Sequence, residues 1–149
     1  MTDDGPVLLV VDDSDDNRYT LVRRLRRQGH QHIREAENGR IALEVLNSQP
    51  IDLVMIDVFR PEVAVAQVLS TMKLDMDLRD VPVIMISAAD ELDIVVRCLE
   101  LGAEDYLPKP FNPTVLNARV TASLDKRRLR NAEHAYLSQL EHLQLAQSI

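Results

Sequence analysis

Residues 7–13 read VLLVVDD, a run of five leucine and valine residues that ends in two aspartates. A continuous apolar run of this length is typical of a strand buried on both faces of a parallel sheet. Two later runs follow the same plan, because residues 53–57 read LVMID and residues 83–87 read VIMIS. Each run is apolar up to a polar last residue, so the sequence predicts buried strands with polar ends.

Helix signals lie between and after these strands. The first helix has leucine and valine on one face and arginines on the other, and Gly29 ends it. Asn112 and Pro113 mark a later helix start, because an N-cap residue there precedes proline at the first helical position. In chain order we expect strands at 7–11, 32–36, 53–57, 82–87 and 105–107, with helices between them, the third at about 65–74.

This alternation predicts an α/β fold, a flavodoxin-like doubly wound five-stranded parallel sheet of order 2-1-3-4-5 with an extended C-terminal helix. In that order the first and third strands are neighbours, and ligands bind outside the carboxyl ends of the strands where the chain reverses direction. Polar residues end or follow four of the strands. They are Asp12, Asp13, Asp57, Ser87 and Lys109. We expect these five side chains to converge on one crevice.

Three carboxylates in one crevice repel one another, and a hard divalent cation such as Mg²⁺ would relieve that repulsion. With the cation bound, an Asp carboxylate can attack a phosphoryl group and form an aspartyl phosphate. Asp57 is the best candidate nucleophile because it lies centrally between the other polar residues. Lys109 would supply a second cation, and the Ser87 hydroxyl could donate to a phosphoryl oxygen.

Composition limits the classes of partner. The 149 residues suit one domain with an appendage, and the net charge of -7 disfavours binding of the whole domain to nucleic acid or an anionic membrane. The arginines of the first helix are expected to form a solvated face. We expect a soluble, cytoplasmic protein for three reasons. The chain has a single cysteine, Cys98, its N-terminus is acidic, and it has no apolar run of about 18 residues.

Four segments together resemble the receiver domains of response regulators in two-component signalling, over roughly residues 5–124. Residues 10–14 (VVDDS) resemble the acidic pair of that family, and residues 52–57 (DLVMID), followed by Pro61, resemble its third strand. Residues 83–88 (VIMISA) and 102–111 (GAEDYLPKPF) resemble its fourth and fifth strands with their flanks. Four motifs in the expected order are a specific signal, whereas each alone would be weak.

The resemblance implies a role for each residue of the crevice. Asp57 would be the phosphoacceptor. Its phosphoryl group would come from a sensor histidine kinase, a phosphotransfer protein or a small phosphodonor. Asp13, Asp57 and the backbone carbonyl of Phe59 would bind Mg²⁺ directly, and Asp12 would act mainly through water.

The resemblance also implies a switch. Lys109 would pair with the phosphoryl group, Ser87 would move toward it, and Tyr106 would turn inward behind Ser87. The Lys109–Pro110 peptide is expected to be cis. The domain would be a regulatory phosphoprotein, not an enzyme, and would catalyse only its own phosphorylation and dephosphorylation.

The chain departs from the family pattern just after Asp57. Residues 58–65 read VFRPEVAV, with Arg60 where the family usually has Met and Val65 where it usually has Gly. Because Val cannot adopt the positive φ that Gly tolerates, we expect a rebuilt loop that alters the rate of phosphoryl transfer.

The C-terminal helix extends past the end of a receiver domain, which predicts a domain at 1–124 and a helical stem at 125–149. Stem residues three or four apart favour a parallel coiled-coil dimer or packing on a neighbouring helix. These are Leu129, Ala132, Tyr136, Leu140, Leu143 and Ala146. Surplus apolar residues on the helix before Gly102 suggest a second partner surface formed by helix 4, strand 5 and helix 5. Similar stems lead to output domains such as cyclases or phosphatases, and this chain contains none.

Two other functions compete. A degenerate receiver would act as a binding or dimerisation module without phosphorylation, and the altered loop at residues 60–65 favours that alternative. A phosphatase of the haloacid dehalogenase type would use the Asp13-Ser14-Asp15 motif. Against it, Asn17 stands where that family has Thr or Val, and the chain has no room for a cap domain.

Overall fold

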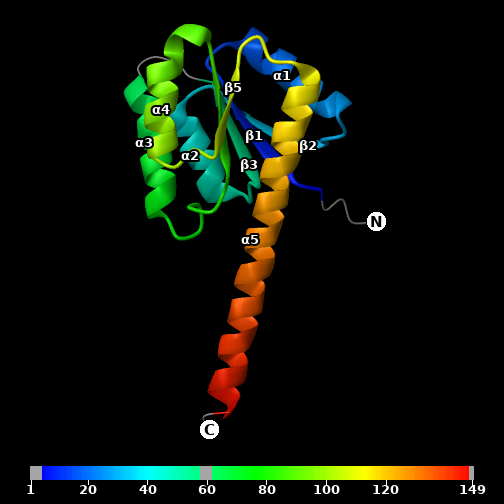
Figure 1. Cartoon of the computed structure of the whole chain (residues 1–149), viewed down its shortest axis with the longest axis vertical. Helices are drawn as coiled ribbons and strands as arrows, with labels where there is room; N and C mark the ends of the chain where they lie inside the picture. The colour runs from blue at the N-terminus through cyan, green and yellow to red at the C-terminus, as the bar shows by residue number, and fades with distance from the viewer. Residues whose placement is uncertain (1–4, 58–61, 148–149) are drawn as a thin grey trace.

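A computed structural model describes residues 5–57 and 62–147 of the chain, and it contains one parallel sheet with helices on both faces (Figure 1). The strand order is β2-β1-β3-β4-β5, as the sequence predicts. The elements, in chain order, are β1 Val7–Val11, α1 Asp15–Arg27, β2 His32–Ala36, α2 Gly39–Ser48, β3 Leu53–Asp57, α3 Glu62–Leu74, β4 Val83–Ser87, a 3-10 turn Ala89–Glu91, α4 Leu92–Glu100, β5 Asp105–Pro108 and α5 Pro113–Gln147.

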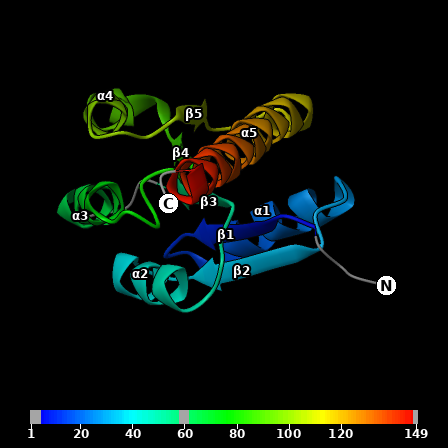
Figure 2. The same ribbon diagram turned by 90° about the horizontal axis from the view of Figure 1, so that it is seen from below.

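The two faces of the sheet bury separate apolar clusters. On one face, Leu8, Val10 and Met55 pack against α1 and against Leu116 and Val120 of α5. On the other face, alternate strand residues pack against α2, α3 and α4. Figure 2 shows α1 and α5 on one side of the strands, and α2, α3 and α4 on the other. Burial on both faces explains why the central strands are continuously apolar.

Side-chain caps fix where the first two helices begin. The Ser14 hydroxyl accepts a hydrogen bond from the Asn17 amide (3.2 Å), and the Asn38 side chain accepts one from the Ile41 amide (2.9 Å). Gly29 and Gly102 follow helices with positive φ of 100° and 114°, which a side chain would oppose. After each turn the chain reverses, and the next strand, β2 or β5, runs parallel to its neighbour in the sheet.

The third helix begins earlier than the sequence predicts. Helix α3 starts at Glu62, so Val65 lies inside it and is fully buried in the core. A helical valine needs no positive φ, so Val65 fits this position without backbone strain. Phe59 and Arg60 lie outside the described residues.

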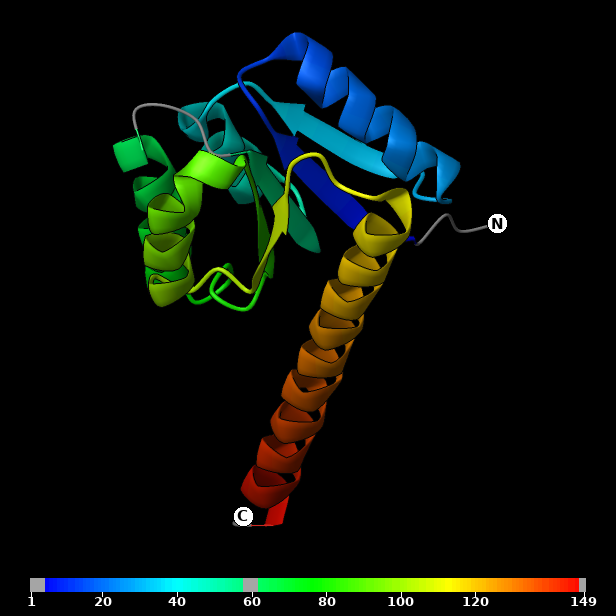
Figure 3. The same ribbon diagram turned by 45° about the horizontal axis from the view of Figure 1, so that its top comes forward.

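Helix α5 is a single helix of 35 residues, about 52 Å long, and its second half leaves the domain (Figures 1 and 3). Residues 131–147 are all exposed. Helix α4 also has exposed apolar side chains, as expected from the sequence. They are Leu92 at 57%, Val96 at 46% and Leu99 at 37% exposure. No helix in the described part of the chain is long and apolar enough to cross a membrane.

Basic residues of α5 bind acidic residues of the loops under the domain. Arg130 pairs with Glu104, and its Nη1 donates to the Asp80 carbonyl (3.1 Å). Lys126 Nζ lies 3.5 Å from Glu104, and His134 Nε2 lies 3.3 Å from Asp80. We call these five residues the stem clamp. It fixes the direction in which α5 leaves the sheet.

Candidate functional site

The carboxyl ends of β1 and β3 bring two aspartates together. Val11 is in register with Ile56, so Asp12, which follows β1, lies beside Asp57 at the end of β3. Both residues are almost fully buried, with exposures of 4% and 6%. Charged groups are rarely buried unless they are paired, so this pair requires compensation.

Backbone and side-chain contacts hold Asp12 in place. Its amide donates to the Ala36 carbonyl of β2 (3.1 Å), and its Oδ1 accepts from the Ser14 amide (2.9 Å). Its carbonyl accepts from Arg18 Nη1 (2.7 Å). Arg18 in turn pairs with Glu35 at 3.0 Å, which ties α1 to β2 beside the site. The Asp12 carboxylate is therefore positioned before any ligand arrives.

Lys109 reaches the same crevice from the end of β5. Its ammonium pairs with the Asp57 carboxylate, and its amide donates to the Ser87 carbonyl at the end of β4 (2.8 Å). The Lys109–Pro110 peptide is cis, as the sequence resemblance implies. Four strand ends thus contribute to one site.

The pKa of Asp57 is raised to about 7. Burial is the largest cause, and a hydrogen bond and the negative charge of Asp12 add to it, whereas the Lys109 ammonium opposes it. One lysine therefore does not neutralise two buried carboxylates. The site has an excess of negative charge that a proton or a second cation can remove.

The donor atoms suit a hard divalent cation, because Asp12 and Asp57 offer two buried carboxylates that the single Lys109 ammonium does not neutralise. Asp13 is exposed. Within residues 5–57 and 62–147, no three His, Cys, Asp or Glu side chains form a group ready to hold a metal. The predicted Phe59 carbonyl ligand lies outside the described residues.

A pocket of about 430 Å³ opens over the two aspartates. It has residues from α1 on one side and the segment after β5 on the other. They are Asp12, Asn17, Thr20, Leu21, Arg24, Asp57, Ile86, Lys109, Pro110 and Phe111. The sequence prediction does not assign the α1 residues Asn17, Thr20 and Arg24 to the site, and it places Arg24 only on a solvated face. Their spacing of three and four after the acidic pair, on one helical face, is the signal that could have found them.

The two predicted switch residues lie behind the site. Ser87 ends β4 and is 2% exposed. Tyr106 is in register with Met85 in the neighbouring strand, is half-buried, and packs against the core on the α2–α4 side of the sheet. Ser87 follows Ile86, the register partner of Asp57, and Tyr106 lies in β5, the strand that Lys109 follows.

Comparison with known proteins gives one consistent family. A family model described as "Response regulator receiver domain" matches residues 8–121. A probable transcriptional regulator of Cyanidium caldarium is 36% identical over 126 residues, which are 85% of this chain and 49% of that protein. A probable cyclic di-GMP phosphodiesterase of Vibrio cholerae is 33% identical over 124 residues, covering 83% of this chain and 28% of the relative. The chain spans about half or less of the length of these relatives.

Solved structures agree with the sequence relatives. The signal receiver domain of a histidine kinase from Syntrophus aciditrophicus has 33% identity and a TM-score of 0.73, covering 81% of this chain and 91% of that one. An adenylate cyclase structure from Rhodopirellula baltica, at 21% identity and a TM-score of 0.78, covers 90% of this chain and 98% of the other. The latter likeness concerns the fold alone.

Proposed function

The chain belongs to the response regulator receiver domain family of two-component signalling, and from that premise we propose that it accepts a phosphoryl group on Asp57. The donor would be a histidine kinase, a phosphotransfer protein or a small molecule such as acetyl phosphate. The observation that supports this most is the buried contact of Asp57 with both Asp12 and Lys109, at the mouth of an open pocket.

In the proposed reaction an Asp57 carboxylate oxygen attacks the donor phosphorus. A P–O bond to the Asp57 carboxyl forms while the P–N bond to a donor histidine, or the P–O bond to acetate, breaks. Asp57 must be deprotonated to attack, and Lys109 favours the charged form. Mg²⁺, when bound by Asp12, Asp13 and Asp57, would supply further positive charge to the transferred group.

The product would place about -1.5 to -2 charges and three acceptor oxygens at the end of β3. We expect Lys109 to pair with one oxygen and the Ser87 hydroxyl to donate to another, with Tyr106 turning inward. The change would pass through α4, β5 and α5 to the stem, residues 125–149, and to an output domain. The exposed apolar side chains of α4 are a candidate partner surface.

The alternatives fit the site less well. A phosphatase of the haloacid dehalogenase type needs Asp13 and Asp15 in a joint active site. Here Asp13 is exposed, and Asp15 lies in the first turn of α1, where it pairs with Arg18. A phosphorylation-independent receiver gives no reason to keep two buried carboxylates, Asp12 and Asp57, side by side next to Lys109 at a cost in stability.

Intact mass spectrometry tests the proposal directly. The protein is incubated with acetyl phosphate and Mg²⁺, and the mass of one phosphoryl group should be added. Asp57→Asn and EDTA should each abolish the addition, whereas Asp77→Asn, at an exposed aspartate far along the chain, should not. If neither acetyl phosphate nor beryllofluoride with Mg²⁺ yields an adduct or a bound complex, the phosphoacceptor role is wrong.

A further inference from the structure

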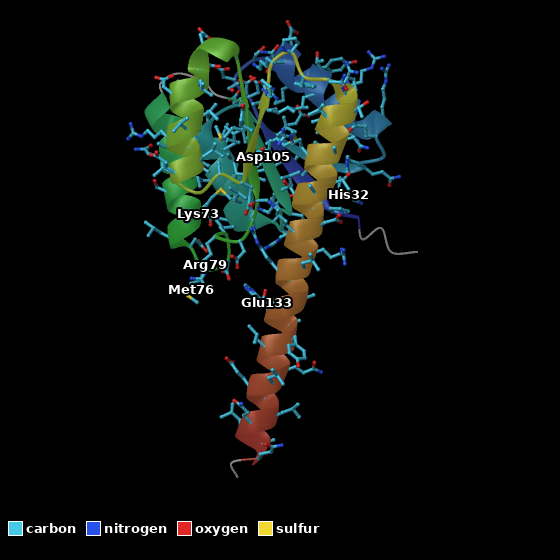
Figure 4. All side chains as sticks on the ribbon, in the orientation of Figure 1. His32, Lys73, Met76, Arg79, Asp105 and Glu133 are labelled. Atoms are coloured by element: carbon cyan, nitrogen blue, oxygen red, sulfur yellow. The ribbon has the colours of Figure 1, made fainter. Side chains whose placement is uncertain are left out.

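A pocket of about 490 Å³ lies at the edge of the sheet opposite Asp57, where α5 leaves the domain. It is bounded by residues that precede β1, β2 and β3 and by one side of α5. The lining residues are Pro6, His30, Asp52, Thr121, Leu124, Asp125, Arg127, Arg128 and Asn131. Figure 4 shows His32 of β2 on one side of α5, and Arg79, which precedes Asp80 of the stem clamp, on the other. The pocket lies on the side of His32, so the pocket and the stem clamp flank the same part of the helix.

Two acid–base pairs line this pocket, and neither is close enough for a hydrogen bond. Arg127 Nε lies 3.8 Å from Asp52 Oδ1, and Arg128 Nη2 lies 3.9 Å from Asp125 Oδ1. Hydrogen bonds between charged nitrogen and oxygen atoms are about 2.7–2.9 Å long. The four charges cancel in sum, yet each group keeps the capacity to bind a closer partner.

The inner pair, Asp52 and Arg127, is the more buried of the two. The Arg127 side chain is 19% exposed, and its Nε has no hydrogen-bond partner within residues 5–57 and 62–147. Asp52 is fixed, since its Oδ2 accepts from the Val7 amide (2.9 Å) and its own amide donates to the Val7 carbonyl (2.8 Å). Buried polar atoms are seldom left without a partner. Arg127 therefore has hydrogen-bonding capacity that the protein itself does not use.

His30 and two apolar residues complete the interior of the pocket. The His30 Nε2 atom is buried and, among the described residues, has no hydrogen-bond partner. Burial lowers the pKa of His30, so its imidazole is neutral at pH 7 and adds no charge to the pocket. Pro6 and Leu124 supply apolar surface. The interior thus offers one positive group, one negative group, a neutral imidazole and an apolar wall.

We infer that this pocket binds a small zwitterion with an apolar body, of the class of an apolar amino acid or dipeptide. Its carboxylate would pair with the Arg127 guanidinium, and its ammonium group with Asp52 Oδ1. An anion alone would be repelled by the Asp52 carboxylate, and a cation alone by the Arg127 guanidinium. A ligand with both charges satisfies the two groups together. The cavity volume lies within the range of small-molecule sites and leaves room for the apolar body against Leu124 and Pro6.

Such a ligand would join α5 to the sheet at the base of the stem. Leu124 and Arg127 belong to α5, whereas Pro6 and Asp52 precede β1 and β3. The ligand would hold the helix on the side opposite the stem clamp. Amide exchange in residues 121–131 should therefore slow when the ligand binds.

Three probes with the same apolar body separate the contributions of the two charges. Leucine carries both charges, isocaproate lacks the ammonium group, and isoamylamine lacks the carboxylate. Chemical-shift titration of the full chain should give leucine, or the dipeptide leucyl-leucine, a dissociation constant on the order of 1 mM or lower. Each single-charge analogue should bind at least about tenfold more weakly. An analogue that binds as well as leucine would overturn the inference. So would the absence of binding by leucine, phenylalanine and leucyl-leucine alike at about 10 mM.

Variants of the two charged residues test the location of the site. Arg127→Gln and Asp52→Asn should each weaken binding of the zwitterion at least about tenfold, whereas Arg97→Gln, at an exposed position on α4, should not. Circular dichroism checks that each variant is folded, and either variant alone suffices for the test. Phosphoryl uptake at Asp57 is measured on the same samples, so a failure of the proposed function is seen separately from a failure of ligand binding. Unchanged binding in folded Arg127→Gln or Asp52→Asn would place the ligand elsewhere and overturn the site.

Discussion

At the scale of single residues, the buried carboxylate of Asp57 lowers the stability of the fold at neutral pH. Its pKa of about 7 in the fold compares with about 3.9 in an unfolded chain. Between those values the folded protein binds a proton that the unfolded chain has lost, so stability falls as the pH rises from about 4 to 7. A carboxylate that is costly to bury is also one held ready for a cation or an electrophilic phosphorus.

Asp57→Asn should therefore stabilise the metal-free protein. The neutral amide keeps the shape but removes the buried charge. The free energy of unfolding at pH 8 should rise by up to about 4 kcal/mol, from three pKa units at 1.36 kcal/mol each, and by little at pH 4. Urea unfolding in EDTA at both pH values measures this, with Asp77→Asn as the control. An equal effect at both pH values would contradict the explanation.

Lys109→Met removes the cation that Asp57 contacts. Two buried carboxylates are then left facing each other, and we expect a loss of about 1 to 3 kcal/mol of unfolding free energy at pH 8. Combining Lys109→Met with Asp57→Asn should recover most of that loss. A double-mutant cycle by urea unfolding gives the coupling directly, and simple additivity would show that the ion pair is unimportant for stability.

Mg²⁺ should stabilise the wild-type protein through Asp12, Asp13 and Asp57. Binding to the folded state alone adds about 2.7 kcal/mol when the free metal is at 100 times its dissociation constant. The midpoint of thermal unfolding should rise with Mg²⁺, fall back on chelation, and be nearly insensitive to Mg²⁺ in Asp57→Asn. Retention of the full metal effect in that variant would place the ion elsewhere.

At the scale of elements, the strands are predictable from sequence because burial on both faces imposes an unbroken apolar run on β1, β3 and β4. The convergence of Asp12, Asp57 and Lys109 follows from strand order alone. The start of α3 at Glu62 is not predictable in that way, since a family pattern with Gly at position 65 suggests a loop. In the structure the segment is helical from Glu62, and Val65 packs into the core from it.

The stem clamp is also beyond prediction from sequence. It joins Glu104 and Asp80 to α5 residues 26 and 50 positions further along the chain, and a surface helix rich in basic residues gives no hint of which loops it meets. Such contacts depend on where α5 crosses the sheet, which is set by tertiary packing.

Glu104→Gln should loosen the base of the stem. Glu104 is largely buried and pairs with both Lys126 and Arg130, so its loss removes two ion pairs at one point. We expect a loss of about 1 kcal/mol in local stability, smaller at high salt, seen as faster amide exchange in residues 126–137. Glu100→Gln, at an exposed position on α4, is the control. Unchanged exchange would show that apolar packing alone fixes the stem.

At the scale of the whole molecule, the proposed phosphorylation site at Asp57 and the stem lie at opposite ends of the strands. The pocket opens at the carboxyl ends of the strands, and α5 leaves from the other edge (Figure 3). The proposed signal from Asp57 to the stem would therefore cross the full length of the sheet. Helix α5 spans both regions, since it starts beside the pocket residue Phe111 and ends beyond the domain.

Strand β5 links these ends by the shortest route. Lys109 follows the last residue of β5 and contacts Asp57. Glu104 precedes the first residue of β5 and contacts Arg130. Five residues of extended chain separate Glu104 from Lys109, a distance of about 17 Å. If the two contacts share one equilibrium through this strand, thermodynamic reciprocity applies to them. Beryllofluoride at Asp57 would change stem association by some factor, and association would change beryllofluoride affinity by the same factor. Titration of beryllofluoride at two protein concentrations measures that equality. Association at the stem would then change the affinity of Asp57 for its ligand by the same factor as the ligand changes association.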